Sequence, residues 1–430
     1  MSKYKRYERY KDSGVEWIGE IPEHWGVKPL KRVFKIINGG TPSSSEESYW
    51  NGEIVWVTPN DLSKLTEACI VDSERKITQD GLHNCSARIV PKGSIVISTR
   101  APIGYVAIAG VPLCTNQGCK SLVAINKVNP KYFYYWMHSI SFYLNVLGQG
   151  TTFIELSNSS LSMVELLTPS INEQKAIANF LDQKTAVIDG LIADKEKLIE
   201  LLQEKRQAII TEAVTKGLNP NVRMKDSGIE WIGEIPEHWE VKKLKHVSNI
   251  TMGQSPKSEE CSYDEIGVPF LQGNAEFTNV HPIPKMYCNT ANKFSKVNDI
   301  LLSVRAPVGA INISDRVYGI GRGLCAITAK KVIMKYLWYS LNVSLEELFI
   351  KSKGSTFEAV TVTDVQNLLI ILPPKNEQDD IVNFLDKKTA EIDGLVIEIK
   401  KQIEKLKEYR QSLISEAVTG KIYVRDYAID

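Results

Sequence analysis

The chain lacks the sequence patterns that mark a membrane protein or a self-sufficient enzyme. In its 430 residues no apolar run approaches the ~18 residues of a membrane-spanning helix. No GxxxxGK[ST] phosphate-binding loop and no (D/N)PP(Y/F) adenine-methyltransferase signature is present. The first residues, MSKYKRYERYKDS, are polar and basic, so a secretory signal is not expected.

Cysteine and histidine are also sparse. The seven cysteines form no CxxC pair, and the six histidines show no spacing typical of a metal site. We therefore expect reduced, partly buried thiols, a cytoplasmic protein and no metal held by the chain. The net charge is only +1, so composition alone does not indicate a nucleic-acid partner, and the hydrophobic content of 43% is ordinary for a globular protein.

The chain does contain a long internal repeat. Residues 11–33 and 225–247 differ at only four of 23 positions. A second near-copy joins NEQKAIANFLDQKTAVIDGL at 172–191 to NEQDDIVNFLDKKTAEIDGL at 376–395. The stretches between these copies match only at scattered points, so we infer one scaffold that presents two different inserts.

The repeat divides the chain into seven predicted segments. Each half has a leader, a globular region and a long helix, and a short tail follows the second half. The segments are an N-terminal leader at 1–24, a first globular region at 25–170, a first helix at 171–218, a linker repeating the leader at 219–238, a second globular region at 239–374, a second helix at 375–422 and a C-terminal tail at 423–430.

Both globular regions are predicted to be α+β. Short β-branched and apolar runs at 52–61, 92–110 and 115–125 predict strands, whereas the 3.6-residue spacing at 129–147 predicts a helix. The second region repeats this plan. The matching short elements are GGTPSS (39–44) with GQSPKS (253–258), STRAPIG (98–104) with SVRAPVG (303–309), and GTTF (150–153) with GSTF (354–357).

The two long segments carry a heptad pattern that predicts a coiled coil. Asn172 and Asn376 are predicted N-caps, and Gly217 and Gly420 are predicted to end the helices. Because equivalent halves tend to adopt two-fold symmetry, we expect the helices to pair antiparallel as a spacer. The predicted seam residues are Ile177, Leu181, Ile188, Leu191, Leu198, Leu202 and Ile209, with Ile381, Leu385, Ile392, Leu395, Ile399, Leu406 and Leu413.

A second apolar row lies beside this predicted seam. Its members are Ile192, Ile199, Val396 and Ile403. Such a stripe is wider than two helices need. Two interpretations stay open, namely packing against the chain's own globular regions and docking of helices from a partner protein.

These motifs together resemble one known family. The duplicated SG[VI]EWIGEIPEHW leader, the GGTP/GQSP element, the [ST]xRAP[IV]G turn, the G[TS]TF element and the NEQ…NFLD.KTA.IDGL helix starts resemble the specificity subunit of type I restriction–modification systems. Each motif alone is weak, but their order and double occurrence are specific. They span the chain from about residue 11 to residue 422.

The resemblance implies a non-catalytic DNA-recognition subunit without a cofactor of its own. Each globular region is then a target recognition domain that binds one half of a bipartite double-stranded DNA sequence. The helices set the gap between the halves and dock two methyltransferase subunits, which methylate adenine with S-adenosylmethionine. Restriction subunits that use ATP and Mg²⁺ complete the nuclease.

DNA contacts are expected from polar residues on the predicted loops, because base edges are recognised by side-chain donors and acceptors. Shared residues such as Arg100 and Arg305 cannot explain two different half-sites, and a core-capping role for them stays open. Divergent residues such as Gln117 and Arg322 are better candidates for base recognition. The candidates are Asn60, Arg100, Asn116, Gln117, Lys120, Thr151 and Thr152 in the first region, and Gln254, Asn274, Arg305, Arg322, Ser355 and Thr356 in the second.

Two rival hypotheses are kept. One is a coiled-coil scaffold without DNA sequence specificity, and the other is an enzyme. YGIGRG at 318–323 superficially resembles a dinucleotide-binding loop, but no βαβ unit surrounds it. We therefore expect a turn near DNA or in the core at this place.

Overall fold

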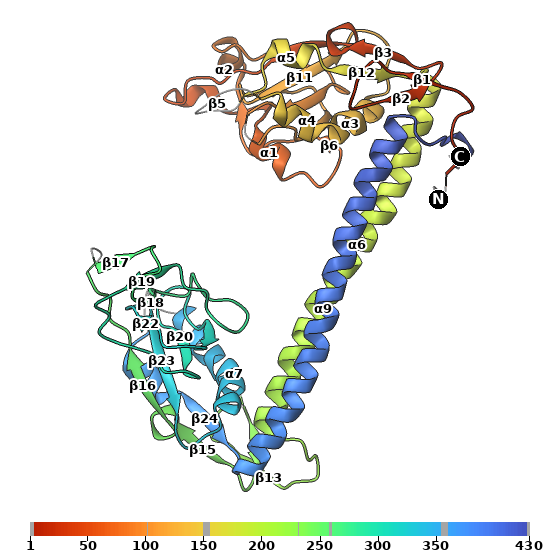
Figure 1. Cartoon of the computed structure of the whole chain (residues 1–430). Coiled ribbons are helices and arrows are strands. Elements are labelled where there is room, and N and C mark those ends of the chain that lie inside the picture. Colours follow the sequence, from red (N-terminus) through yellow and green to blue (C-terminus); the bar gives the residue numbers. More distant parts are fainter. Residues whose placement is uncertain are drawn as a thin grey trace. The chain divides into compact units, whose positions relative to one another are not determined.

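The structure is a computed structural model that describes residues 4–100, 102–148, 155–230, 232–257, 260–353 and 360–427, with the backbone alone for 346–353. It divides into two compact units: unit 1 is Met1–Lys195 with Lys401–Asp430, and unit 2 is Glu196–Lys400. Each unit combines one globular region with parts of the two long helices, α6 (Ile171–Lys216) and α9 (Lys375–Val418) (Figure 1). The α+β prediction is confirmed in both units.

Unit 1 is built on a five-stranded sheet with the order β4-β11-β8-β9-β6. Ile95 and Ile97 of β8 pack against Phe133 on one face of this sheet, whereas Val96 packs with Val57 on the other. Both faces are covered, which explains why the strand sequence is continuously apolar. The bounds are β4 (Phe34–Asn38), β11 (Cys119–Ala124), β8 (Ile95–Ser98), β9 (Val106–Ala109) and β6 (Cys69–Ile70).

The remaining elements of unit 1 surround this sheet. The predicted helix at 129–147 is two helices, because the chain leaves the helical conformation at Ile140. The strands are β10 (Cys114–Thr115), β5 (Trp50–Val57) and β7 (Lys76–Ile77) in one sheet, β12 (Glu165–Thr168) with β3 (Gly26–Pro29), and β1 (Tyr10–Asp12) with β2 (Glu20–Pro22). The helices are α1 (Pro59–Ser63), α2 (Gln79–His83), α3 (Pro130–Ser139), α4 (Ser141–Val146) and α5 (Asn158–Ser162).

Unit 2 repeats the central arrangement with a four-stranded sheet of order β16-β23-β20-β21. A second sheet has the order β17-β19-β18-β22. The central strands are β16 (Ser248–Met252), β23 (Leu324–Ala329), β20 (Ile300–Ser303) and β21 (Ile311–Ile313). The others are β17 (Cys261–Ser262), β19 (Met286–Cys288), β18 (Val268–Leu271), β22 (Gly319–Ile320), β15 (Glu240–Lys243), β24 (Leu369–Leu372), β13 (Met224–Asp226) and β14 (Glu234–Pro236), with helices α7 (Met334–Lys353) and α8 (Val362–Asn367).

The units differ where their sequences diverge. In unit 1, β5 is followed by α1, which has a Thr58 capping box with Asp61 and a proline in its first turn. The matching strand of unit 2, β18, is followed by Gly273 and Asn274, and no helix forms there in the described chain. The inserts therefore vary mainly in the segments that connect a shared strand framework.

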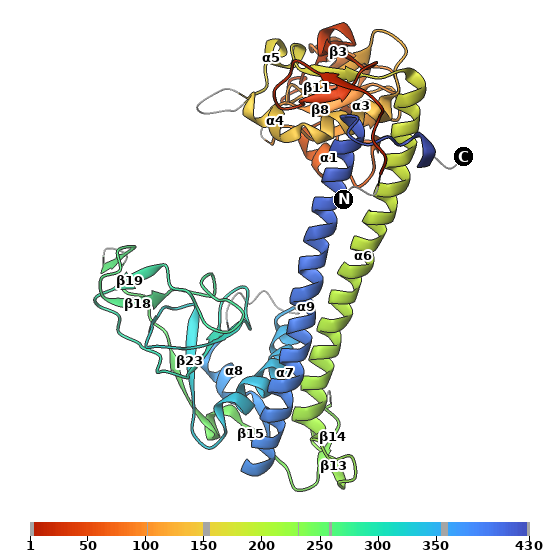
Figure 2. The ribbon, with the colours of Figure 1, turned by 45° about the vertical axis from the view of Figure 1, so that its right-hand side comes forward.

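The long helices pair antiparallel within each unit, as the two views of the chain show (Figures 1 and 2). In unit 1, Arg410 Nε lies 2.8 Å from Asp189 Oδ1, and Lys195 Nζ donates to Gln402 Oε1 at 2.6 Å. In unit 2, Arg206 Nε lies 3.0 Å from Asp393 Oδ1. Residue numbers rise along one helix as they fall along the other, so the expected antiparallel pairing is present in each unit.

The seam between the helices differs from the predicted one. Leu191, Leu198 and Leu395 were expected in the seam, but they are 46%, 45% and 54% exposed. Ile403 was expected beside the seam, but it is only 5% exposed. The prediction of the seam was therefore wrong at Leu191, Leu198 and Leu395. Eight other predicted seam residues are buried, as expected: Ile177, Leu181, Ile188, Ile381, Leu385, Ile392, Ile399 and Leu413.

The helix starts also differ from the prediction. Ser170 caps α6, because its Oγ accepts from Glu173 N at 3.3 Å while Glu173 Oε2 accepts from Ser170 N at 3.2 Å. Asn172 and Asn376 lie inside the first turns of α6 and α9, so neither is an N-cap. The predicted helix ends are confirmed, since glycines with φ of +75° and +72° follow α6 and α9 at positions 217 and 420.

The repeated leader closes the base of each globular region. Trp25 and Trp239 are fully buried, and each indole N–H donates to the glutamate in the first turn of a long helix, Glu173 at 3.3 Å and Glu377 at 2.9 Å. The histidines of the repeated EHW contact the same two carboxylates, at 2.8 Å in unit 1 and 2.7 Å in unit 2. This duplicated contact explains why the leader and the helix starts are the most similar parts of the repeat.

Candidate nucleic-acid interface

Two short loops, one in each unit, occupy the same place in the shared framework. Loop 1 (residues 115–118) joins β10 to β11, and loop 2 (residues 320–323) joins β22 to β23. At its start, loop 1 accepts a backbone hydrogen bond from Gly40 N at 2.9 Å, and loop 2 accepts one from Gln254 N at 2.8 Å. At its end, Gly118 O accepts from Thr99 N at 2.8 Å, just as the carbonyl of residue 323 accepts from the strand-end amide of residue 304 at 2.9 Å.

The GGTP and GQSP elements lie directly against these loops. A Cβ at Gly39 would collide with the carbonyl of Asn116, and a Cβ at Gly253 would collide with the carbonyl of Gly321. Only glycine permits this approach of two backbones. The glycines of YGIGRG serve the same purpose, so this segment is a packed turn, as expected.

One exposed side chain projects from each loop. Gln117 is exposed beside the buried Gly118, and Arg322 is exposed between two buried glycines. Thr41 Oγ1 donates to Gln117 Oε1, and Ser255 Oγ accepts from Arg322 Nε at 3.4 Å. The framework is therefore the same in both units, while the exposed group changes from an amide to a guanidinium.

A pocket of about 560 Å³ in unit 1 brings together three of the predicted residues, Arg100, Gln117 and Lys120. Arg100 is exposed, and its Nε donates to Glu155 Oε2 at 3.0 Å. Lys120 is only 5% exposed, and its Nζ donates to Leu156 O at 2.8 Å. Burial lowers the pKa of Lys120, and the nearby Glu155 carboxylate opposes that shift.

The other predicted residues of unit 1 have local partners. Asn116 Oδ1 accepts from Gly118 N at 2.9 Å, which closes the turn of loop 1. Asn60, exposed at the start of α1, donates to Glu74 Oε2 at 3.0 Å. Thr151 and Thr152 lie outside the described residues.

Unit 2 brings its predicted residues to the same end of the framework. Gln254 is exposed next to loop 2, and Asn274, after β18, donates to Pro307 O at 3.4 Å. Arg305 is exposed, and the described residues offer it no side-chain hydrogen bond or ion pair. Ser355 and Thr356 lie outside the described residues.

The pairing of Arg100 distinguishes the two units. The sequence has Ala359 at the position of Glu155 and Cys325 at the position of Lys120. The buried cation and its carboxylate are thus present together in unit 1 and absent together in unit 2. This pattern favours a packing role for Lys120, whereas Arg305 keeps an exposed guanidinium.

Three residues at this site were not predicted from the sequence: Thr41, Ser255 and Gln272. The amide of Gln272 lies against Ser255, with Nε2 at 2.9 Å and Oε1 at 3.2 Å from Oγ. The aligned hydroxyls of GGTP and GQSP were a usable signal for the first two residues. No sequence signal indicated Gln272, because its partner Ser255 lies 17 residues away.

The comparison with known families decides the identity of the chain. Residues 22–201 and 236–405 match the family described as the type I restriction modification DNA specificity domain. The chain belongs to this family. The resemblance deduced from its motifs is confirmed. The chain is a type I specificity subunit, which is a DNA sequence-recognition protein.

Full-length relatives agree with this assignment. The chain is 30% identical to the type I restriction enzyme MjaIX specificity subunit of Methanocaldococcus jannaschii, over 99% of each chain. It is 31% identical to the putative MjaX specificity subunit of the same organism, over 95% of this chain and 96% of the relative. A solved chain from work on complex assembly and conformational transition of the type I R-M system has the same fold, with a TM-score of 0.72, 23% identity and coverage of 93% of this chain and 98% of that one.

The helix face predicted to dock partners of the specificity subunit is largely used within the chain. Ile192 packs against the core of unit 1, and Ile403, which also belongs to unit 1, is buried. Ile199 is half-buried, and Val396 lines a pocket of unit 2. A role of these four residues in partner binding stays a prediction, while the outward apolar residues include Val187 at 62% exposed.

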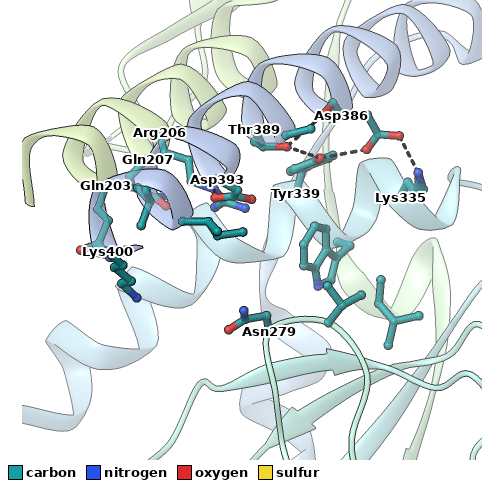
Figure 3. A pocket seen from close by; sticks show the side chains of 16 residues that line it. Gln203, Arg206, Gln207, Asn279, Lys335, Tyr339, Asp386, Thr389, Asp393 and Lys400 are labelled. Carbon is teal, nitrogen blue, oxygen red and sulfur yellow. Dashed lines mark hydrogen bonds and ion pairs between the residues drawn. The ribbon is translucent and has the colours of Figure 1, made fainter. Parts of the chain in front are cut away.

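The pocket at Val396 has a volume of about 790 Å³ and lies between α7 and the two long helices (Figure 3). Asp386 accepts from Lys335 at 2.5 Å and from Tyr339 at 2.9 Å on one side of it, and Arg206 approaches from α6. None of the DNA-contact candidates lines this pocket. It therefore belongs to the packing between α7 and the helix pair.

The described ranges contain no arrangement of side chains or helices typical of a metal site or a membrane span. No group of three or more His, Cys, Asp or Glu side chains is placed to hold a metal there. None of the helices in that part of the chain is long and apolar enough to cross a membrane. All seven cysteines are free thiols, and Cys114, Cys119, Cys288 and Cys325 are buried.

Proposed function

We propose that this specificity subunit recognises a bipartite double-stranded DNA target, with one half-site contacted by each globular region. The observation that carries the proposal is the pair of equivalent loops. Their backbone hydrogen bonds are shared, but their exposed side chains, Gln117 and Arg322, differ. An amide pairs best with adenine and a guanidinium with guanine, so two such loops suit two different half-sites.

The helix pair is proposed to set the unspecified gap between the half-sites. Two observations support this role. The helices pair antiparallel within each unit, and α6 and α9 are continuous helices of 46 and 44 residues. At ~1.5 Å per residue each spans roughly 65–70 Å. Such a rod is long compared with a turn of DNA, which rises about 34 Å.

We further propose that the subunit is not itself an enzyme and acts through partners. Two methyltransferase subunits dock on the helix region and methylate adenine with S-adenosylmethionine, and restriction subunits with ATP and Mg²⁺ join through them. The chain has no P-loop and no methyltransferase signature, which supports a division of labour. The exposed apolar residues Leu191 and Leu395 offer surface for a protein partner.

Methylation sequencing of a host that carries the methyltransferase with and without this chain tests the proposal. We expect a bipartite adenine motif that appears only with the chain. If the methyltransferase is active and no chain-dependent motif appears, the proposal is wrong. A coiled-coil scaffold without DNA sequence specificity would give that negative result, and it would also lack the steep loss of DNA affinity with rising salt that phosphate contacts produce.

A further inference from the structure

In both units, a hydroxyl of the GGTP or GQSP element contacts the exposed side chain of the adjoining loop. In unit 2, Ser255 Oγ accepts from Arg322 Nε at 3.4 Å and from Arg322 N at 3.2 Å. In unit 1, Thr41 Oγ1 donates to Gln117 Oε1. Thr41 and Ser255 each follow the glycine that touches the loop by two residues. The contact thus recurs although its partner has changed.

Unit 2 adds a second layer to this contact. The amide of Gln272 lies against Ser255 Oγ, and it reaches that position because Gly321 has no side chain, since a Cβ there would lie 2.7 Å from Gln272 Oε1. In unit 1 the residue matching Gln272 is Thr58, whose hydroxyl donates to Asp61 Oδ2 at 2.6 Å in the capping box of α1. The hydroxyl of Ser255 is thereby held in place from two sides.

The contacts with the hydroxyls leave the side-chain atoms of Arg322 and Gln117 that would bind a base available for hydrogen bonding. Ser255 contacts Nε of Arg322, and the described residues make no hydrogen bond to the two terminal guanidinium nitrogens of Arg322. Those nitrogens form the fork that binds guanine O6 and N7. For Gln117, the amide oxygen has a second lone pair and the amide nitrogen stays available, which is the pair of groups that adenine requires.

We propose that Thr41 and Ser255 are positioning residues that orient Gln117 toward an adenine of one half-site and Arg322 toward a guanine of the other, and that Gln272 fixes Ser255. This inference rests on the proposed DNA-recognition function. An exposed arginine without such a contact samples many rotamers, so its preference for one base weakens. The role of the hydroxyl is therefore selectivity, not affinity.

The test uses the full chain expressed with its methyltransferase, and the readout is the base preference at each position of the methylated motif. Arg322→Ala identifies the position that Arg322 recognises. At that position we expect Ser255→Ala to raise methylation of non-guanine sites on the order of tenfold, because a bidentate contact gives discrimination of that size or more. Gln272→Ala, an exposed substitution, is expected to act in the same direction, and the other half-site stays unchanged in all three variants.

The repeat supplies matched controls. Ser255→Thr and Thr41→Ser exchange the two hydroxyl residues that the chain itself uses, so both are expected to keep the original motif. Thr41→Ala is expected to relax an adenine position in the other half-site only. A uniform fall in methylation without a change of base preference would indicate a structural role and overturn the inference.

Three further outcomes separate this inference from the proposed function. If Arg322→Ala relaxes guanine but neither Ser255→Ala nor Gln272→Ala does, positioning is refuted while DNA recognition stands. An unchanged motif in Arg322→Ala would also refute the inference. If the unaltered chain directs no motif at all, the proposed function itself fails.

Discussion

Glu173 lies at the start of α6 with 1% of its side chain exposed. His24, Ser170 and Trp25 donate hydrogen bonds to it, and Arg425 from the C-terminal tail lies 3.1 Å away. Burial alone would raise the pKa of Glu173, but these hydrogen bonds outweigh it and hold the pKa below its usual value. One carboxylate therefore joins the leader, the first helix and the tail.

We expect Glu173→Ala to lower the free energy of unfolding by about 2–3 kcal/mol, because it leaves the buried indole N–H of Trp25 without an acceptor. Since the folded-state pKa is depressed, the ionised group stabilises the fold above its unfolded pKa, and this stabilisation fades as pH falls through the folded value. Denaturant unfolding between pH 7 and pH 3 measures both effects. Glu377→Ala is the matched control, and it should cost less because the side chain of Glu377 is 34% exposed.

Lys120 poses a different question at the same scale, namely packing or DNA contact. Its amine donates to a buried carbonyl at 2.8 Å, and Glu155 lies 3.7 Å away. We expect Lys120→Ala to reduce the free energy of unfolding by about 1–3 kcal/mol, as an unsatisfied buried acceptor does, and to leave the methylated motif unchanged. A relaxed base preference in this variant would contradict the packing role and restore Lys120 as a DNA-contacting residue.

A double variant sharpens this prediction. Lys120→Cys with Glu155→Ala installs the residues that the second unit has at the matching positions. Because the two side chains form one network, we expect the double variant to cost less than the sum of the two single variants. Additive costs would show that the ion pair makes no joint contribution to stability.

At the scale of elements, the pairing of the long helices determines which apolar residues are buried and stabilise the fold. Ile403 is 5% exposed and Leu191 is 46% exposed, both within unit 1. We expect Ile403→Ala to lower the free energy of unfolding by roughly 2–3 kcal/mol, through lost burial and a cavity, and Leu191→Ala to change it by less than about 0.5 kcal/mol. The two variants are measured by urea unfolding of the isolated chain, and equal costs would contradict the observed seam.

The helices themselves were predictable, but which of their residues face inward was predictable only in part. Leu191 and Ile192 are adjacent, as are Leu395 and Val396, so a heptad fits either row equally well. Only the packing of the partner helix selects between rows that lie about 100° apart around a helix. The N-cap prediction for α6 was wrong for a related reason. Ser170 and Asn172 are both suitable capping residues two positions apart, and the hydrogen bonds of Ser170 with Glu173 select Ser170.

The candidate site was predicted only in part, because some of its contacts join residues that are far apart in the sequence. Comparing the two copies singled out Gln117 and Arg322, because the repeat aligns their loops. Their hydroxyl partners come from segments 76 and 67 residues away in the sequence, so no local pattern relates them. The burial of Lys120 was not predicted, since the pattern at 115–125 predicts a strand but does not show that the side chain of Lys120 is covered.

At the scale of the whole molecule, the duplication makes a length prediction possible. Opposed residues in the helix pair are known from the ion pairs Asp189–Arg410 and Arg206–Asp393, which place Ile199 opposite Lys400, next to Ile399. Inserting one heptad after Ile199 and one after Ile399 keeps the 3.5-residue seam in phase. If the pair is the spacer between half-sites, each helix lengthens by about 10 Å, which corresponds to about three base pairs at 3.4 Å per base pair.

We therefore expect the double insertion to leave both half-site sequences unchanged and to lengthen the unspecified gap by about three base pairs. Methylation sequencing with the cognate methyltransferase measures gap and half-sites in the same experiment. Insertion of four residues in each helix is the control for phase, because it shifts the apolar row by half a heptad and should weaken methylation. An unchanged gap with an intact motif would show that the helices do not set the spacing, and it would leave base recognition by the two loops unaffected.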